Sequence, residues 1–234
     1  MTASIRTLDF YFDYLSPFAY FAAVRLPDIC QSRGVELQYR PVLFAGLLNH
    51  WGQLGPAEVL PKAIHTFKTT YRYAALGGIP FSPPRFHPFV PLTALRATLR
   101  DICGDDQALV VKTLFELGWA EGRDPGDSKD IADALTAAGL DGDTLVAATR
   151  EEEAKQSLRM DTEDAIARGV FGVPTMIAGD ELFWGVDQLP YLELYLDGQD
   201  PWEKANPDES GYQGRAAQRP GSIGRGPGLG GDSA

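Results

Sequence analysis

A run of aromatic residues that ends at a serine–proline pair constrains the fold of this chain most. Residues 8–14 predict a strand in which apolar and aromatic side chains predominate. Ser16 follows as a helix N-cap, because its hydroxyl oxygen can accept a hydrogen bond from the first helical turn. Pro17 then stands at the first helical position, where no backbone N–H is needed. The helix should end before Gly34, and residues 35–43 predict a second strand.

Further along the chain the apolar spacing becomes helical and then returns to strands. Helix-compatible spacing predicts helices over residues 93–102, 106–121, 128–138, 141–160 and 161–168. Strands are predicted over residues 175–178 and 181–184, with a last helix from residue 187 to about residue 196. Pro27 lies inside the first predicted helix and predicts a kink or an early stop there. The chain should therefore contain a β–α–β half, a helical insertion and a β–β–α half.

This order predicts an α/β chain with two structural units and a tail. Residues 1–43 and 169–198 form one discontinuous unit, and residues 44–168 form a helical unit inserted after the second strand. From residue 199 the periodicity is lost, and residues 211–234 are dominated by small and polar residue types. Because so few apolar residues cannot offset the entropy of ordering, we expect a disordered tail over residues 199–234.

The composition is typical of a globular protein that does not bind nucleic acid. Apolar residues make up 44% of the 234 residues and charged residues 23%, and the net charge of −11 argues against a concentrated basic surface. We expect no membrane span, because no apolar stretch reaches about eighteen residues, and the N-terminus has no signal-peptide core. Cys30 and Cys103 lack metal-ligand or disulfide spacing, so we expect a cytoplasmic protein with reduced thiols and no metal.

Ser16 is the first candidate functional residue. A serine hydroxyl is a weak nucleophile without a base, and none of the three histidines, His50, His65 and His87, stands in a hydrolase motif. A hydroxyl at a helix N-terminus can instead donate a hydrogen bond to an anionic sulfur, which the helix dipole also favours. The alternative interpretation is that Ser16 is only an N-cap.

Two later segments can bind a peptide-like ligand. If the Val173–Pro174 bond is cis, the Val173 N–H and C=O are free to pair with an extended ligand; the alternative is a trans proline that opens a strand. Val186 and Asp187 begin the last predicted helix, where free N–H groups can hold a carboxylate. The Asp187 side chain can hold an ammonium group, so the pair matches an α-amino acid end. The alternative is that Asp187 is a simple N-cap.

Together these motifs resemble the 2-hydroxychromene-2-carboxylate isomerases, which belong with the kappa-class glutathione transferases among the DsbA-like thioredoxin folds. The resemblance covers about residues 8–196. It rests on Phe12-Asp13-x-x-Ser16-Pro17-x-x-Tyr20, Gly172-Val173-Pro174-Thr175, Phe183-Trp184-Gly185-x-Asp187 and the middle segment His87-Pro88-Phe89. Each motif is short, but their order and spacing are fairly specific together.

The resemblance implies a DsbA-type thioredoxin fold with a helical domain inserted after the second strand. The two positions at which such folds carry cysteines are Ser16 and Ala19, which sets a disulfide oxidoreductase aside. The implied activity is that of a glutathione-dependent isomerase in which Ser16 is catalytic and holds the glutathione sulfur as a thiolate. The implied glutathione-binding residues are Pro17, Phe18, Gln53, Lys62, Val173, Pro174, Val186 and Asp187.

The implied reaction is a reversible conjugate addition with cis–trans isomerisation of an unsaturated keto acid from aromatic degradation. Lys62 and Arg72 are either ligands of the substrate carboxylate or charges on a solvated helix. A cavity between the two units is expected, lined by Phe18, Phe44, Trp51 and Phe81, although such aromatics are more often core. Related enzymes suggest a homodimer. Two alternatives stay open: a kappa-like transferase that conjugates electrophiles, and a non-catalytic thioredoxin-fold binding module.

Overall fold

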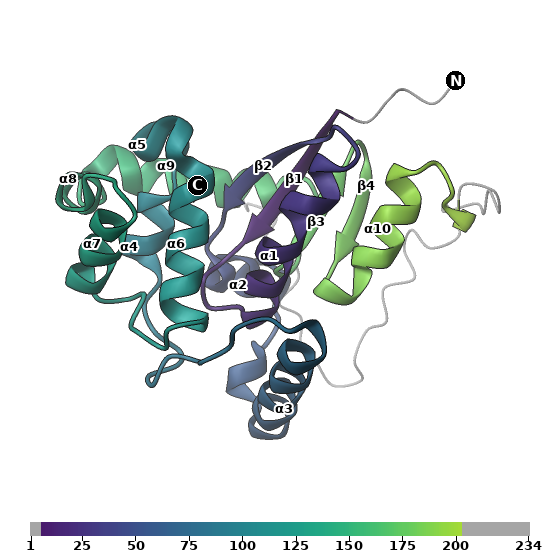
Figure 1. Cartoon of the computed structure of the whole chain (residues 1–234), viewed down its shortest axis with the longest axis horizontal. Helices are drawn as coiled ribbons and strands as arrows, with labels where there is room; N and C mark the ends of the chain where they lie inside the picture. The colour runs from purple at the N-terminus through teal and green to yellow at the C-terminus, as the bar shows by residue number, and fades with distance from the viewer. Residues whose placement is uncertain (1–5, 203–234) are drawn as a thin grey trace, which may run out of the picture.

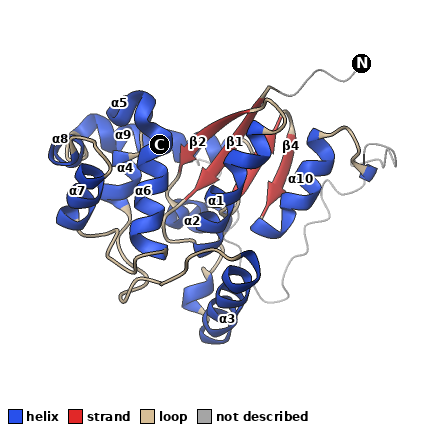
Figure 2. Cartoon of the chain, in the orientation of Figure 1, coloured by secondary structure: helices blue, strands red, loops and turns tan. Residues whose placement is uncertain are grey.

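A four-stranded mixed sheet forms the centre of the molecule. The computed structural model describes residues 6–202. The sheet has the order β2-β1-β3-β4 (Figure 1), and its strands are drawn in red in Figure 2. Its strands are β1 (Thr7–Phe12), β2 (Glu36–Pro41), β3 (Thr175–Ala178) and β4 (Glu181–Trp184). β1 pairs in parallel with β2 and antiparallel with β3, and β3 pairs antiparallel with β4. The predicted bounds of the last two strands are confirmed, and the first two strands are shorter than predicted.

The first helix, α1 (Pro17–Gln31), begins where the sequence predicts. The Ser16 Oγ accepts a hydrogen bond from the Ala19 N–H at 3.2 Å, which satisfies one of the free donors of the first turn. The early stop at Pro27 is wrong, because the helix continues to Gln31. Pro27 removes one helical hydrogen bond, but Leu26 and Ile29 on either side of it are buried and keep the helix in place.

Eight helices connect β2 to β3 within the described chain, and one further helix follows β4. They are α2 (Phe44–Trp51), α3 (Leu60–Gly77), α4 (Leu92–Ala97), α5 (Arg100–Cys103), α6 (Gln107–Trp119), α7 (Ser128–Ala137), α8 (Gly142–Ala148), α9 (Glu152–Ala167) and α10 (Leu189–Leu196). Single 3-10 turns are η1 (Pro56–Glu58), η2 (Gly104–Asp106) and η3 (Val186–Gln188). Figure 1 shows α4 to α8 gathered beyond the β2 edge and α10 beside β4.

Two predicted helices are broken at threonines. The helix predicted over residues 93–102 is interrupted after α4, where the Thr98 hydroxyl donates to the Ala94 carbonyl at 2.8 Å. The helix predicted over residues 141–160 stops after α8, where the Thr149 hydroxyl donates to the Val146 carbonyl at 2.7 Å. Such a bond alone does not end a helix, because the Thr162 hydroxyl makes the same bond to the Leu158 carbonyl inside α9. At Thr98 the hydroxyl also lies 2.7 Å from the Tyr14 hydroxyl of the core. No break occurs at Asp161, and α9 runs through it.

The two faces of the sheet pack against different helices. Leu8, Phe10 and Phe12 alternate onto one face and are fully buried in the large core that includes side chains of α1 and α6. Tyr11 and Ile177 lie in a second, smaller core. Its other members include Leu47 from α2 and Ala165 from α9. The division into units at residues 43 and 169 remains a proposal, and α9 packs against the sheet although it precedes the second boundary.

The ends of the chain lie partly outside the described residues. The predicted tail begins at residue 199, and its residues 203–234 are outside the described range. Within the range, the Trp202 N–H donates to the Asp200 carboxylate at 2.9 Å. No helix between residues 6 and 202 is both long and apolar enough to cross a membrane.

The contact between α7 and α8 depends on Gly142. A Cβ atom on Gly142 would lie 2.1 Å from the Ala132 carbonyl oxygen and 2.7 Å from the Thr136 Oγ1. We expect Gly142→Ala to lower the free energy of unfolding by about 2–3 kcal/mol, because two backbones must separate. Denaturant unfolding measures the change. Gly77→Ala is the control, since the nearest atoms there belong to the flexible Ile79 side chain. Equal stability of the two variants would contradict the prediction.

Candidate active site

Ser16 and Val173 are adjacent in space although they are far apart in the chain. The Ser16 hydroxyl lies 3.5 Å from the Val173 carbonyl oxygen and donates to it. The Ser16 N–H donates to the Asp13 carbonyl at 3.0 Å, which closes the turn between β1 and α1. Ser16 is half-buried. The hydroxyl proton is therefore held by a long, weak hydrogen bond, and a better acceptor can displace the carbonyl.

The peptide bond before Pro174, beside Ser16, could be cis or trans, and the cis form was the one expected to leave the Val173 backbone free. The Val173–Pro174 peptide bond is cis. The Pro174 carbonyl accepts from the Gly185 N–H at 2.9 Å, and the Thr175 hydroxyl donates to the Gly172 carbonyl at 2.8 Å. Among the described residues the Val173 N–H has no hydrogen-bond partner. This N–H is thus available to an extended ligand.

Asp187 lies on the single turn η3, after β4. Gly185, at φ 106°, lets the chain turn there, and a Cβ on it would clash with the Asp187 Oδ1. The Asp187 side chain is exposed and accepts a hydrogen bond from the Gln188 Nε2 at 3.3 Å. Val186 is buried. An exposed carboxylate so loosely held can bind a ligand cation.

The other predicted ligand residues are on α1, α3 and the α2–α3 connection. Pro17 is buried and Phe18 is half-buried beside the Phe21 ring. Gln53, Lys62 and Arg72 are exposed, and across residues 6–202 their side chains make no ion pair or hydrogen bond. The structure therefore does not link these three residues to Ser16, and their roles remain predictions.

Three side chains that were not among the predicted site residues hold the turn that carries Ser16, although Asp13 and His87 belong to the motifs behind the resemblance. The Asp13 carboxylate is fully buried and accepts from the Leu15 N–H at 3.0 Å and the Phe44 N–H at 2.9 Å. The Trp119 Nε1 donates to the Tyr14 carbonyl at 2.8 Å. The His87 Nε2 lies 2.9 Å from the Leu15 carbonyl oxygen and must donate its proton, since a carbonyl only accepts.

Burial controls the protonation of two of these groups. Burial raises the pKa of Asp13 to about 6, against the opposing effect of its two backbone N–H donors. Burial also lowers the pKa of His87, which keeps the ring neutral. The sequence did contain a signal for Asp13, because it is an acidic residue among aromatic residues at the end of the first predicted strand. The role of Trp119 carried no such signal, because the residue is distant in the chain.

The aromatic residues predicted to line a cavity do not form one wall. Phe81 stacks on Trp119 with ring centroids 6.0 Å apart, and Phe18 packs against the same large core. Phe44 packs against the smaller core on the other face of the sheet. The Trp51 Nε1 donates to the Val170 carbonyl at 3.0 Å. The predicted lining is therefore wrong, because Phe44 packs on a different core from Phe18 and Phe81, and Trp51 is 43% exposed.

The described chain has no reactive thiol of its own. Cys30 and Cys103 are buried, and burial raises the pKa of each thiol to about 11. A thiol with so high a pKa is almost wholly protonated at neutral pH and a poor nucleophile. The arrangement around Ser16 thus offers a hydroxyl donor, a helix N-terminus and a free backbone N–H to a group supplied from outside.

Comparisons with known proteins show what this chain is similar to. The family model of the DSBA-like thioredoxin domain matches residues 7–197. A 2-hydroxychromene-2-carboxylate isomerase from Sphingobium xenophagum is 34% identical over 194 residues, which span 82% of this chain and 98% of that protein. Glutathione S-transferase kappa 2 of Caenorhabditis elegans is 29% identical over 212 residues, covering 82% of this chain and 92% of that one.

A solved structure has the same fold over nearly its whole length. The structure of 2-hydroxychromene-2-carboxylate isomerase superposes with a TM-score of 0.75 at 30% identity, covering 86% of this chain and 98% of that chain. The predicted DsbA-like thioredoxin fold is thereby confirmed. The chain belongs to the DSBA-like thioredoxin family and, within it, to the family of the 2-hydroxychromene-2-carboxylate isomerases.

Proposed function

We propose that this protein is a glutathione-dependent isomerase that interconverts the cis and trans forms of an unsaturated keto acid. The isomerase relatives support the class of enzyme. The observation that carries the proposal is the Ser16 hydroxyl at the N-terminus of α1, next to the Val173 backbone, in a protein whose described cysteines are both buried.

The residues at this site fit the chemical groups of glutathione. Glutathione, when bound, supplies a thiolate that adds reversibly to the conjugated double bond and so permits rotation. The Ser16 hydroxyl donates a hydrogen bond to the sulfur, and the positive end of the α1 dipole favours its anionic form. The Val173 N–H and C=O pair with the cysteinyl backbone. The exposed Asp187 carboxylate holds the γ-glutamyl ammonium group, and the Val186 backbone lies beside it.

The remaining assignments rest on the likeness to the isomerase relatives. Pro17, Phe18, Gln53, Lys62 and Pro174 complete the glutathione site, and Lys62 and Arg72 are the cations available to a substrate carboxylate. The substrate is a small molecule from aromatic degradation. We further propose a cytoplasmic location, since reduced glutathione is the form that such a site needs. A homodimer is proposed on the resemblance to related enzymes alone.

A kappa-like transferase is the second candidate function, favoured by the kappa-class relative. Both functions need the same thiolate, and they differ in whether glutathione leaves unchanged. A third possibility is a binding module without turnover. This module would show no glutathione-dependent activity.

The glutathione balance distinguishes these functions. Incubation of the purified protein with 2-hydroxychromene-2-carboxylate and glutathione should give the isomer while total free glutathione stays constant. Omission of glutathione should abolish the conversion. Chromatography quantifies both compounds. Consumption of one glutathione for each product molecule would favour the transferase, and no binding of glutathione in the millimolar range would exclude both enzymes.

A further inference from the structure

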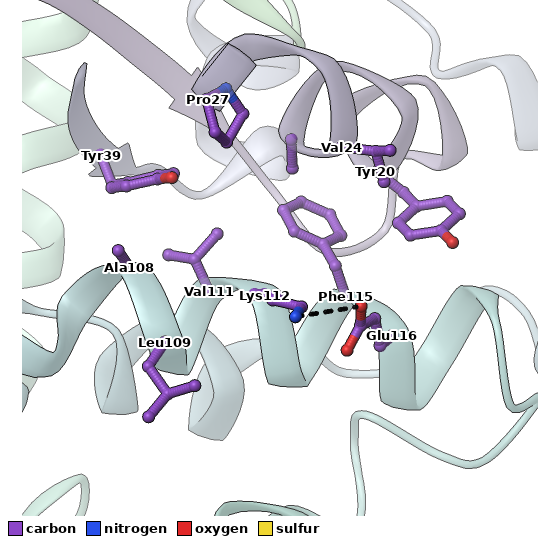
Figure 3. A pocket seen from close by; sticks show the side chains of 11 residues that line it. Tyr20, Val24, Pro27, Tyr39, Ala108, Leu109, Val111, Lys112, Phe115 and Glu116 are labelled. Atoms are coloured by element: carbon purple, nitrogen blue, oxygen red, sulfur yellow. Dashed lines mark ion pairs between the residues drawn. The ribbon is translucent and has the colours of Figure 1, made fainter. Parts of the chain in front are cut away.

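A cavity of about 400 Å³ lies between α1 and α6. Figure 3 shows side chains of α1 and β2 on one side and those of α6 on the other. Its lining includes none of the residues proposed to bind glutathione. Its volume is within the range of small-molecule sites, which extends from about 300 to 1,000 Å³. The cavity is therefore large enough for a ligand that does not touch Ser16.

The walls of this cavity are mainly aromatic and aliphatic. The rings of Tyr39 and Phe115 face it, together with Pro27 and Val111 (Figure 3). Val24 at its mouth is 40% exposed, whereas Val111 and Phe115 form a closed floor and are each 1% exposed. Apolar surface left in water around a concave site favours a ligand that covers it. The walls of the cavity thus favour a ligand with a flat, apolar part.

Two hydrogen-bond donors lie at this cavity. Figure 3 shows the Tyr39 hydroxyl turned toward the space, and in the part of the chain that the structure describes this hydroxyl has no partner. The neighbouring Tyr20 hydroxyl, by contrast, donates a hydrogen bond to the Pro80 carbonyl at 2.8 Å. Burial raises the pKa of Tyr39 to about 12, so its hydroxyl keeps its proton at neutral pH.

The second donor is the Lys112 ammonium group. Its Nζ lies 4.0 Å from the Glu116 Oε1, and the Lys112 side chain is 69% exposed. An exposed pair at this separation on one helix contributes little to stability. Lys112 can therefore turn to a ligand anion without the loss of a strong bond. The Glu116 charge opposes that anion and should weaken its binding.

We propose that the cavity between α1 and α6 is an accessory site for a small aromatic carboxylic acid. The aromatic ring lies against Val24 and Tyr39, and the carboxylate accepts hydrogen bonds from the Lys112 ammonium and the Tyr39 hydroxyl. A ligand there contacts α1, the helix whose N-terminus carries Ser16. The proposal is independent of the glutathione chemistry.

Titration of the full chain with 2-naphthoate tests this proposal. Isothermal calorimetry should show saturable binding to one site. Lys112→Met should weaken the binding by about five- to tenfold, and Glu116→Gln should tighten it, since the two changes alter the local charge in opposite directions. The uncharged 2-naphthalenemethanol should bind wild type and Lys112→Met equally.

Two variants that fill the mouth separate this cavity from the site at Ser16. Ala108→Trp and Val24→Trp add bulk at exposed lining positions, where the fold tolerates it, and each should abolish 2-naphthoate binding. Ser16→Ala should leave the binding unchanged. Absence of saturable binding, binding that survives both tryptophan variants, or binding lost in Ser16→Ala would overturn the proposal.

Discussion

Ser16→Ala is expected to lower kcat for isomerisation by about 100- to 1,000-fold, which is the usual effect of removing one donor to a reacting anion. In the proposed mechanism, loss of the hydroxyl removes the side-chain donor to the glutathione sulfur and lowers the fraction in the thiolate form. The fold should persist, because loss of the N-cap bond to Ala19 costs about 1 kcal/mol. Turnover at saturating glutathione measures the effect, and circular dichroism checks the fold.

Asp127→Ala is the matched control for the structural part of this change. Asp127 caps α7 by accepting from the Lys129 and Asp130 N–H groups, so its loss has a similar cost in stability. It lies on the helical segment and should leave turnover unchanged. Ser16→Thr keeps a hydroxyl and should recover part of the activity. If Ser16→Ala and Asp127→Ala retain equal activity, Ser16 is only a helix cap.

Asp13→Asn is expected to change how stability depends on pH. The folded protein holds the Asp13 pKa at about 6, mainly through burial, compared with 3.8 for a free carboxyl group. The folded state thus binds this proton more tightly. The resulting stabilisation is fully present below the unfolded pKa and is lost as the pH rises through the folded pKa. Its full size is about 3 kcal/mol.

The measurement is the difference in unfolding free energy between wild type and Asp13→Asn. Because asparagine does not titrate, the advantage of wild type should fall by about 3 kcal/mol between about pH 4 and pH 7.5. Asp141→Asn serves as the control. Hydrogen bonds from Thr144 lower the Asp141 pKa, so its stabilisation is lost as the pH falls. A difference for Asp13→Asn that does not vary with pH would contradict the burial argument.

Local patterns and motifs predicted much of this molecule. The aromatic strand, the cap at Ser16 and the two last strands follow from alternation and capping rules that act over a few residues. The proximity of Ser16 and Val173 followed from the resemblance alone, since no local rule joins positions so far apart. The family comparisons then confirmed the fold.

Features that depend on tertiary contacts escaped prediction. The break at Thr98 coincides with a contact to Tyr14, which is distant in the chain. No local rule separates Thr149, where a helix ends, from Thr162, whose hydroxyl bonds back inside an intact helix. The lining of the cavity was wrong because an aromatic side chain packs equally well in a core or at a site, and only its neighbours decide. The partners of Asp13 and Trp119 are backbone groups, which a residue pattern does not reveal.

The turn between β1 and α1, which carries Ser16, is held by side chains from the helical segment, so the position of Ser16 depends on that segment staying folded. Trp119 at the end of α6 and His87 before α4 both hold backbone carbonyls of that turn. Local opening of either segment should release the turn that carries Ser16 before the strands of the central sheet separate. On heating, we therefore expect enzymatic activity to be lost at a lower temperature than the secondary structure.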